Sequence, residues 1–271
     1  MFWGFFFVFS FVDDISVCLI FPNPVRLRPL NYLYTMGRVF EKRKHKMFAR
    51  YDKMAKAFTR VGREIAIAVK AGGPDPAYNP RLRTAVQNAK GLNMPKDRID
   101  GAIKRAVSKD EGNFEEIVYE GYGPHGVAIV VETATDNTTR TVANIRMYFN
   151  RGNGTLGKTG SLDFMFQRKG VFRIANDGKV NVEELELELI DFGLDSMEVD
   201  EEEIIIYTAY EDFGKMAKGL EEKKIEVKKA ALERLPTTFV ELSEEQQDEI
   251  LQLVDKFEED DDVQAVYHNL K

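Results

Sequence analysis

Residues 152–159, GNGTLGKT, match the phosphate-binding loop pattern G-x-x-x-x-G-K-[ST]. In such a loop, backbone amides surround the phosphates, the lysine (here Lys158) contacts the terminal phosphates and the hydroxyl (here Thr159) binds magnesium. The loop must open a helix whose N-terminus faces the phosphate. Here a predicted helix precedes the motif and a strand-like run follows Gly160. We therefore expect a flexible helix-to-strand loop. A loop that touches a nucleic-acid backbone without catalysis, and a nucleotide site, stay open as alternatives.

Other residue types that carry out catalysis form no recognisable group. The chain has three histidines, His45, His125 and His268. Their spacing is unlike that of metal ligands. The sequence has neither a Ser/His/Asp grouping nor an HExxH motif. Carboxylates occur in runs such as residues 201–203 and 260–262, which we expect to be mostly solvated faces. We predict that the protein is not an enzyme and needs no cofactor and no metal.

A row of basic residues recurs every three or four positions along one predicted helix. Its members are Lys46, Arg50, Lys53, Lys56, Arg60 and Arg63. At 100° per residue this basic row occupies an arc largely apart from the apolar positions. Asp52 and Glu64 are the only acids on that helix, whereas an ordinary solvated face mixes both signs. The basic row therefore favours phosphate contact over a merely solvated face.

Phosphate contacts position a protein without reading sequence, and they weaken steeply with salt. We predict that replacing Lys53, Arg60 and Arg63 together with Glu abolishes nucleic-acid binding. Thermal stability should stay nearly unchanged, because surface charges contribute little to folding. Loss of the fold would mean that the basic row is structural.

The predicted nucleic-acid contacts extend beyond this row. Arg98, Arg105 and Lys109 fall on one outer face of the third predicted helix, at i, i+7 and i+11. The complete candidate set is Lys42, Arg43, Lys44, Lys46, Arg50, Lys53, Lys56, Arg60, Arg63, Arg81, Arg83, Lys96, Arg98, Arg105, Arg140, Lys158 and Arg168.

The charge of the chain is strongly divided. Residues 36–110 carry 19 Lys/Arg and 7 Asp/Glu, a net of +12, whereas residues 111–271 carry 17 and 36, a net of −19. The overall net charge of −7 hides this division. A polyanion is attracted to the first part and repelled by the second. The division points to a nucleic-acid or nucleoprotein partner.

Apolar periodicity predicts three helices in the basic part. Residues 38–46 form a basic arm that we expect to be mobile without a partner. Residues 47–71 form a long amphipathic helix, and Gly72-Gly73-Pro74 ends it. Its expected apolar face is Tyr51, Met54, Ala55, Phe58, Val61, Gly62, Ile65, Ala68 and Val69. Asn79-Pro80 begins the second helix and Asn93-Met94-Pro95 the third.

From residue 115 onward, single strands and strand pairs alternate with helices. The expected helices lie at residues 137–150, 182–192, 213–223 and 244–257. The expected strands lie at residues 117–122, 127–133, 161–166, 170–174, 197–199, 204–207, 225–232 and 263–267. This alternation indicates two small α+β sandwiches of ferredoxin-like character. Periodicity alone leaves the strand pairing open.

The first 35 residues differ from the rest of the 271-residue chain. Residues 1–12 are apolar but too short to span a bilayer, and they lack the positive segment that begins a secretory signal. We expect residues 1–35 to be a non-native or disordered leader, with Met36 as the native start. An unusual targeting or membrane-associating leader is the alternative. Cys18 is the only cysteine, so no internal disulfide is possible and a cytoplasmic location is expected.

Several ordered segments carry a family resemblance. They include NPRLR at 79–83, NMPKD at 93–97, YEGYGP at 119–124, TDN at 135–137, RTV at 140–142, MF at 165–166, RKG at 168–170 and VYHN at 266–269. The chain resembles the YebC family of bacterial proteins, which also includes a mitochondrial translational activator. It departs from the usual Gly-His-Ser-Lys-Trp-like opening of that family, with GRVFE at 37–41.

The resemblance implies an α+β multidomain fold, with an N-terminal three-helix module and two small ferredoxin-like α/β domains around a cleft. The helical domain would span residues 36–110, and one α/β domain would combine residues 111–165 with 237–271. The other α/β domain, residues 166–236, would be inserted in it. The resemblance also implies no enzymatic activity. Family members are commonly described as DNA-binding transcriptional regulators, and others resemble translation factors that act on stalled ribosomes.

Two functions therefore compete. A DNA-binding transcriptional regulator would need an exposed recognition element and usually two-fold symmetry. The sequence shows neither a helix-turn-helix nor a sustained heptad pattern, so we expect a monomer. The second candidate is a ribosome-associated translation factor. A ribosome would present ribosomal RNA to the basic part of the chain and basic protein tails to the acidic part. The charge division favours the second function, and the usual description of the family favours the first. No membrane partner is expected.

Overall fold

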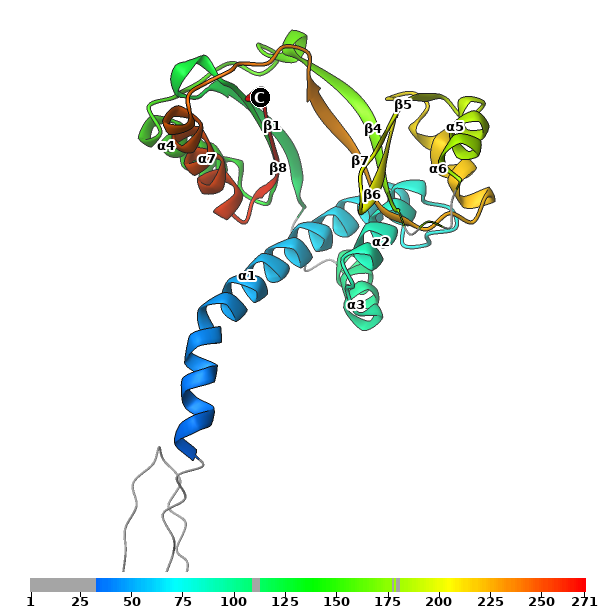
Figure 1. Cartoon of the computed structure of the whole chain (residues 1–271), viewed down its shortest axis with the longest axis horizontal. Helices are drawn as coiled ribbons and strands as arrows, with labels where there is room; N and C mark the ends of the chain where they lie inside the picture. Colours follow the sequence, from blue (N-terminus) through cyan, green and yellow to red (C-terminus); the bar gives the residue numbers. More distant parts are fainter. Residues whose placement is uncertain (1–32, 109–112, 177, 179–180) are drawn as a thin grey trace, which may run out of the picture. The chain divides into compact units, whose positions relative to one another are not determined.

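The computed structural model describes residues 33–108, 113–176, 178 and 181–271, with side chains from Tyr51 onward (Figure 1). The prediction that residues 1–35 form a leader falls almost entirely outside this part of the chain. In the described part, no helix combines the length and the apolar character needed to cross a membrane.

The first helix, α1 (Leu33–Gly72), begins well before the predicted residue 47. The expected mobile arm at residues 38–46 is therefore wrong, because those residues are helical. Lysine, arginine and glutamate favour helices, and residues 33–72 contain no proline to interrupt one. The apolar face is also shorter than expected. Tyr51 and Met54 are 52% and 39% exposed, and burial begins at Val61.

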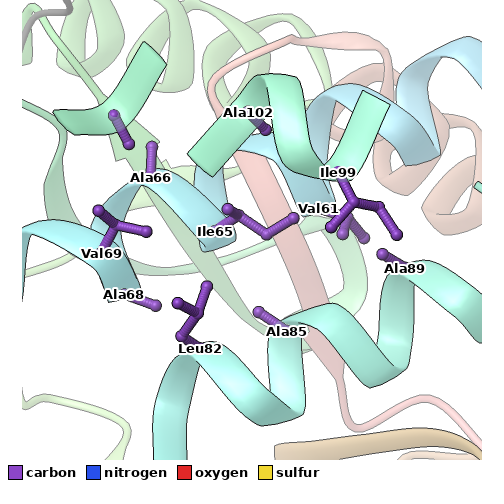
Figure 2. Packing of buried hydrophobic residues seen from close by; sticks show 11 residues of the cluster. Val61, Ile65, Ala66, Ala68, Val69, Leu82, Ala85, Ala89, Ile99 and Ala102 are labelled. Atoms are coloured by element: carbon purple, nitrogen blue, oxygen red, sulfur yellow. The ribbon is translucent and has the colours of Figure 1, made fainter. Parts of the chain in front are cut away.

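Helices α1, α2 (Pro80–Gly91) and α3 (Lys96–Val107) share one core. Ile65 and Leu82 are fully buried at its centre, and alanines on all three helices let the backbones approach closely (Figure 2). Asn79 caps α2, since its side-chain oxygen accepts the Leu82 amide at 3.1 Å. The Asn79 amide group donates to the Ala68 carbonyl at 2.6 Å, which joins α1 to the start of α2.

Sheet A is antiparallel, with strand order β3-β1-β2-β8. Its strands are β1 (Glu115–Tyr122), β2 (Ala128–Thr135), β3 (Thr155–Leu156) and β8 (Val263–His268). Helices α4 (Thr138–Arg151) and α7 (Glu244–Glu259) pack on one face of it (Figure 1). Phe149 and Phe257 meet in that core, with ring centroids 4.8 Å apart.

Sheet B is also antiparallel, with strand order β5-β6-β4-β7. Its strands are β4 (Phe166–Ala175), β5 (Leu194–Val199), β6 (Glu203–Ala209) and β7 (Val227–Pro236). Helices α5 (Val182–Ile190) and α6 (Phe213–Glu222) cover one face. The chain order β-α-β-β-α-β with this strand order has the predicted ferredoxin-like character. Sheet A instead centres on the β1–β2 hairpin.

The two sheets are nested in the sequence. All of sheet B lies between β3 and α7, and β8 then returns to the edge of sheet A beside β2. The predicted α+β multidomain class is confirmed. The exact domain boundaries stay a prediction.

Helix α2 packs against β7, one of the two edge strands of sheet B. Asn88, only 7% exposed, donates to the Ala230 carbonyl at 2.9 Å and accepts the Ala230 amide at 2.8 Å. One side chain thus replaces the missing neighbour strand at this position of β7. Unpaired strand edges favour aggregation, so this pairing protects the sheet.

Replacing Asn88 with Ala should lower the free energy of unfolding by about 2 kcal/mol, since it leaves a buried amide and carbonyl unpaired. Urea unfolding measures the loss, and hydrogen exchange should show a faster Ala230 amide. The matched control is Gln87→Ala, which removes the neighbouring amide side chain from the same helix. An Ala230 amide that stays fully protected in Asn88→Ala would contradict this role.

Candidate nucleic-acid interface

Four members of the basic row have described side chains on α1, Lys53, Lys56, Arg60 and Arg63, and the last two of these are not free. Arg60 donates to the Glu258 carbonyl at 2.8 Å. Arg63 donates to the carbonyls of Ala134, at 3.1 Å, and Asp261. The same guanidinium lies 3.2 Å from the Asp262 carboxylate and 5.4 Å from the centre of the Phe114 ring. These arginines therefore bind the acidic segment that ends α7.

Asp262 is the centre of this attachment. Its side chain is 4% exposed and accepts hydrogen bonds from Thr141 at 2.8 Å and Thr135 at 3.2 Å. Arg140 forms an ion pair with it at 2.9 Å, in addition to the pair with Arg63. One buried carboxylate thus joins α1, the end of β2, the start of α4 and the entry to β8.

The environment of Asp262 favours its charged form. Burial by itself would raise the pKa of Asp262, but hydrogen bonds from Arg140 and Thr141 lower it. The charges of Arg140 and Arg63 act in the same direction, so the net pKa lies below its ordinary value. The carboxylate is therefore ionised at neutral pH and balances the two guanidinium groups.

Three expectations from the sequence are corrected here. Arg60 and Arg63 are not free surface cations, because tertiary contacts with residues 258–262 engage both of them. The unchanged stability expected for the variant with Lys53, Arg60 and Arg63 replaced by Glu is therefore wrong, since Arg63→Glu removes a cation from the buried Asp262. Asp262 is not part of a solvated face, since Arg63 and Arg140 enclose it. A helical pattern shows which side of α1 is basic, but it does not show what that side packs against.

A polar cavity of about 540 Å³ lies beside this network. Its walls include Arg63, Arg140 and Asp136, together with the acidic residues at positions 259–262. Carboxylates outnumber cations in the cavity, so it does not suit a phosphate group. Among the described residues, no cluster of histidine, cysteine and carboxylate side chains could hold a metal ion.

Other candidate cations are also occupied. Arg81 pairs with Glu116, and Arg83 donates to the Ala77 carbonyl at 3.0 Å and lies 3.5 Å from Glu221. Arg140 binds Asp136 at 2.8 Å as well as Asp262. The side chains of Lys42, Arg43, Lys44, Lys46, Arg50 and Lys109 lie outside the described part of the chain.

The remaining candidates have no ion-pair partner among the described residues. They are Lys53, Lys56, Lys96, Arg98, Arg105, Lys158 and Arg168. Lys90 and Lys104 also have no ion-pair partner among the described residues, and the set of contacts predicted from the sequence did not include them. Both lysines lie in the last turn of a helix. Basic residues are common there because they interact favourably with the helix dipole, so the sequence did not mark these two as nucleic-acid contacts.

The free cations of α3 include an arginine pair with a glycine between them. Arg98, Gly101 and Arg105 share one helix face at i, i+3 and i+7. The Arg98 guanidinium lies 5.9 Å from the centre of the Phe58 ring of α1, and Arg105 donates to the Gly101 carbonyl at 3.4 Å. No atom would meet a Cβ at Gly101, so packing does not require glycine there. We name these three residues the α3 ridge.

The α3 ridge has the properties of a phosphate contact. Its guanidinium groups can each donate two parallel hydrogen bonds to a phosphate. A glycine in a helix costs about 1 kcal/mol relative to alanine, and it permits close approach of another backbone. Asp97 and Asp100 form no ion pair with either arginine, although Asp97 lies only about 40° around the helix from Gly101.

The glycine-rich motif at residues 152–159 does not form a phosphate-binding loop. Its Thr155 and Leu156 are strand β3, paired with Tyr122 and Gly121 of β1. A short 3-10 turn follows, η2 (Asp163–Met165), in place of the required α-helix.

The buried Glu120 carboxylate binds the chain directly after the motif. It accepts the amides of Gly160 at 2.9 Å and Leu162 at 2.7 Å. Phosphate would be repelled from this position, so we do not propose a nucleotide site. A Cβ at Gly154 would lie 2.6 Å from the Tyr122 carbonyl oxygen, so close backbone packing accounts for that glycine.

The described histidines have local structural contacts. His125 lies 2.9 Å from Glu249 and 3.3 Å from Gln246, both on α7. Burial lowers the pKa of His268, so this side chain is neutral at pH 7. The side chain of His45 lies outside the described part.

Two protein-family models match the chain. The model described as the TACO1/YebC protein N-terminal domain matches residues 38–109. The model described as the TACO1/YebC second and third domain matches residues 114–270. Together these matches cover most of the chain.

Individual relatives agree with these matches. A "probable transcriptional regulatory protein" of Cytophaga hutchinsonii is 60% identical over 235 residues, which is 87% of this chain and 98% of the relative. A protein of the same description from Anaeromyxobacter dehalogenans is 55% identical over 240 residues, 87% of this chain and all of the relative. The crystal structure of a conserved hypothetical protein from Aquifex aeolicus is similar, with a TM-score of 0.72 and 38% identity. It covers 80% of this chain and 90% of its own.

Replacing Asp262 with Asn should lower the free energy of unfolding by about 3 kcal/mol, because two arginines lose a buried anion. The pKa of Asp262 is lowered in the folded state, so its contribution exists above the unfolded-state pKa and disappears as the pH falls. The stability difference between the two proteins should therefore shrink below about pH 4. Urea unfolding from pH 7 to pH 3 measures it.

The control for this experiment is Asp261→Asn, which removes the neighbouring exposed carboxylate and should change stability by less than about 0.5 kcal/mol. Equal effects of the two substitutions would show that net charge, not the buried network, determines the result.

Proposed function

Since the chain belongs to the TACO1/YebC family, we propose that it is a regulatory protein that binds nucleic acid and catalyses no reaction of its own. Relatives at 60% and 55% identity carry the description "probable transcriptional regulatory protein", which supports a regulatory role. We further propose a monomer of three domains, divided at the boundaries predicted from the sequence, that needs no cofactor and acts in the cytoplasm.

The observation that supports nucleic-acid binding most directly is the α3 ridge. Arg98 and Arg105 are exposed, lack acidic partners in the described part of the chain, and flank a glycine that packing does not require. We propose that Lys53, Lys56 and Lys96 extend this contact along α1 and α3. Such contacts would hold a phosphate backbone without selecting a base sequence.

Two targets are compatible with this surface. The names of the relatives favour duplex DNA and transcriptional regulation. The charge of residues 111–271, a net of −19, favours a ribosome-associated translation factor, because a duplex would repel this part. Ribosomal RNA together with basic ribosomal proteins would match both signs of charge. This match of both charges is the reason that the translation factor is the second candidate function.

Sedimentation with purified ribosomes, run beside a gel-shift titration with duplex DNA in the same salt series, separates the two targets. Ribosome binding much tighter than duplex binding supports the translation factor. Salt-resistant binding to particular DNA sequences, with no ribosome association, supports the transcriptional regulator. Binding to neither would contradict the proposed function.

Replacing Arg98 and Arg105 with Ala should weaken binding and should lower the slope of log affinity against log salt by about two, one for each lost phosphate contact. The matched control is Arg81→Ala with Arg83→Ala, since these arginines already pair with Glu116 and Glu221. Fluorescence anisotropy across a salt series measures both slopes. An equal change in slope for both double variants would show that the α3 ridge has no special role.

Replacing Gly101 with Ala should have opposite effects on stability and binding. Unfolding should require about 1 kcal/mol more, because alanine favours the helix and open space receives its methyl group. Binding should weaken, because that methyl group separates the ridge from the phosphate backbone. The control is Gly62→Ala on α1, where a Cβ also meets no atom. It should stabilise the protein without affecting affinity. Unchanged affinity in Gly101→Ala would remove the functional argument for this glycine.

A further inference from the structure

Two segments of the chain cross side by side between sheet A and sheet B. Residues 157–165 lead from β3 into β4, and Thr237 begins the return from β7. Phe166 pairs with Pro236 at the end of the ladder, and Thr237 continues it, since its amide and hydroxyl donate to the Met165 carbonyl at 2.9 and 3.1 Å. Phe164 directly precedes Met165, and Phe239 follows Thr237 by two residues, so both phenylalanines lie at this junction.

Both phenylalanines face solvent. Phe164 is 75% exposed and Phe239 is 59% exposed, whereas Phe166, the first residue of β4, is only 5% exposed. Burying a phenylalanine side chain contributes about 1.5–3 kcal/mol, so leaving two uncovered at one junction forgoes stabilisation. Neither belongs to a hydrophobic core of the described residues. Their exposure is thus not explained by packing.

The two crossing segments, residues 157–168 and 236–241, carry two cations and two carboxylates, and only the carboxylates have ion-pair partners among the described residues. Lys158 and Arg168 are exposed and have no ion-pair partner among the described residues. The two nearby carboxylates are occupied, because Asp163 pairs with Arg234 at 3.5 Å and Glu241 pairs with Lys271. The amide of Ser161 donates to the Lys158 carbonyl at 3.1 Å, so Lys158 belongs to the turn that leads toward the junction. Two cations without an ion-pair partner among the described residues thus lie on these segments, within the acidic part of the chain.

We propose that Lys158, Phe164, Arg168 and Phe239, the junction patch, bind unpaired nucleotides of a single-stranded nucleic acid. The exposed rings provide faces on which bases stack, and the two cations contact the backbone between those bases. A duplex does not suit the patch, because its bases are already stacked inside the helix. An acidic peptide would use the cations but would leave the rings uncovered. The inference rests on the proposed nucleic-acid binding and adds a second contact surface, separate from the α3 ridge.

The test compares the full chain and its variants on three probes of one sequence: a single-stranded RNA, a single-stranded DNA and the duplex. Phe164→Ala with Phe239→Ala should weaken binding to the single strands at least tenfold and to the duplex less than twofold. The conservative variant Phe164→Trp should retain single-strand binding, because a larger ring still stacks. Photocross-linking of a 4-thiouridine RNA should identify a peptide that contains Phe164 or Phe239.

The matched control is Leu187→Ala on α5, a truncation at a side chain that is 70% exposed and lies in an acidic helix. It should leave all three affinities unchanged. Single-strand binding that is equal in wild type and the double phenylalanine variant would overturn the proposal and would indicate a protein partner for the patch. Equal weakening on single strands and duplex would also overturn it, since stacking requires unpaired bases.

The same experiment separates failure of this proposal from failure of the proposed function. If wild-type protein binds none of the probes, both are wrong. If Arg98→Ala with Arg105→Ala reduces binding while the phenylalanine variants do not, the proposed function stands and the junction patch is rejected. A preference between the two single strands then shows whether the ribose hydroxyl contributes.

Discussion

One buried carboxylate joins the helical part of the chain to sheet A. Asp262 balances Arg63 from α1 and Arg140 from α4, and it accepts both neighbouring threonine hydroxyls. Removing one partner from such a group leaves an uncompensated buried charge, which is far more destabilising than the loss of an exposed ion pair. The helical part and sheet A are therefore joined by electrostatics, whereas each is held internally by its own apolar core.

The elements that follow from local chemistry could be predicted from the sequence. Asn79-Pro80 marks the start of α2, because the side-chain cap and the fixed proline φ act within four residues. The α+β alternation and the ferredoxin-like character also follow from apolar periodicity and from the resemblance, whereas periodicity leaves the strand order of sheet B open. The start of α1 could not be placed, since a charged segment without proline is compatible with both a helix and a mobile arm.

The partners of charged groups could not be predicted in the same way. The basic row has correct helical spacing, yet Lys53 is free while Arg60 and Arg63 are engaged by a segment about 200 residues away. Asp260, Asp261 and Asp262 are identical in type and adjacent in sequence. Only the tertiary fold distinguishes Asp262, which is 3% exposed, from the exposed Asp261. Apolar periodicity also could not predict that Phe164 and Phe239 are exposed. In the sequence, a single phenylalanine next to a strand looks the same as a core residue.

The nested order of the two sheets has a consequence for how the chain folds as it is synthesised. Every strand and helix of sheet B precedes α7 and β8, so this unit is complete in sequence while sheet A still lacks its last strand. Domains fold as units from the N-terminal side during synthesis. The β2 edge must therefore stay unpaired until β8 emerges, after all of sheet B has been made. Asp262 directly precedes β8, so the ion pair that joins α1 to sheet A can form only after sheet B has been synthesised.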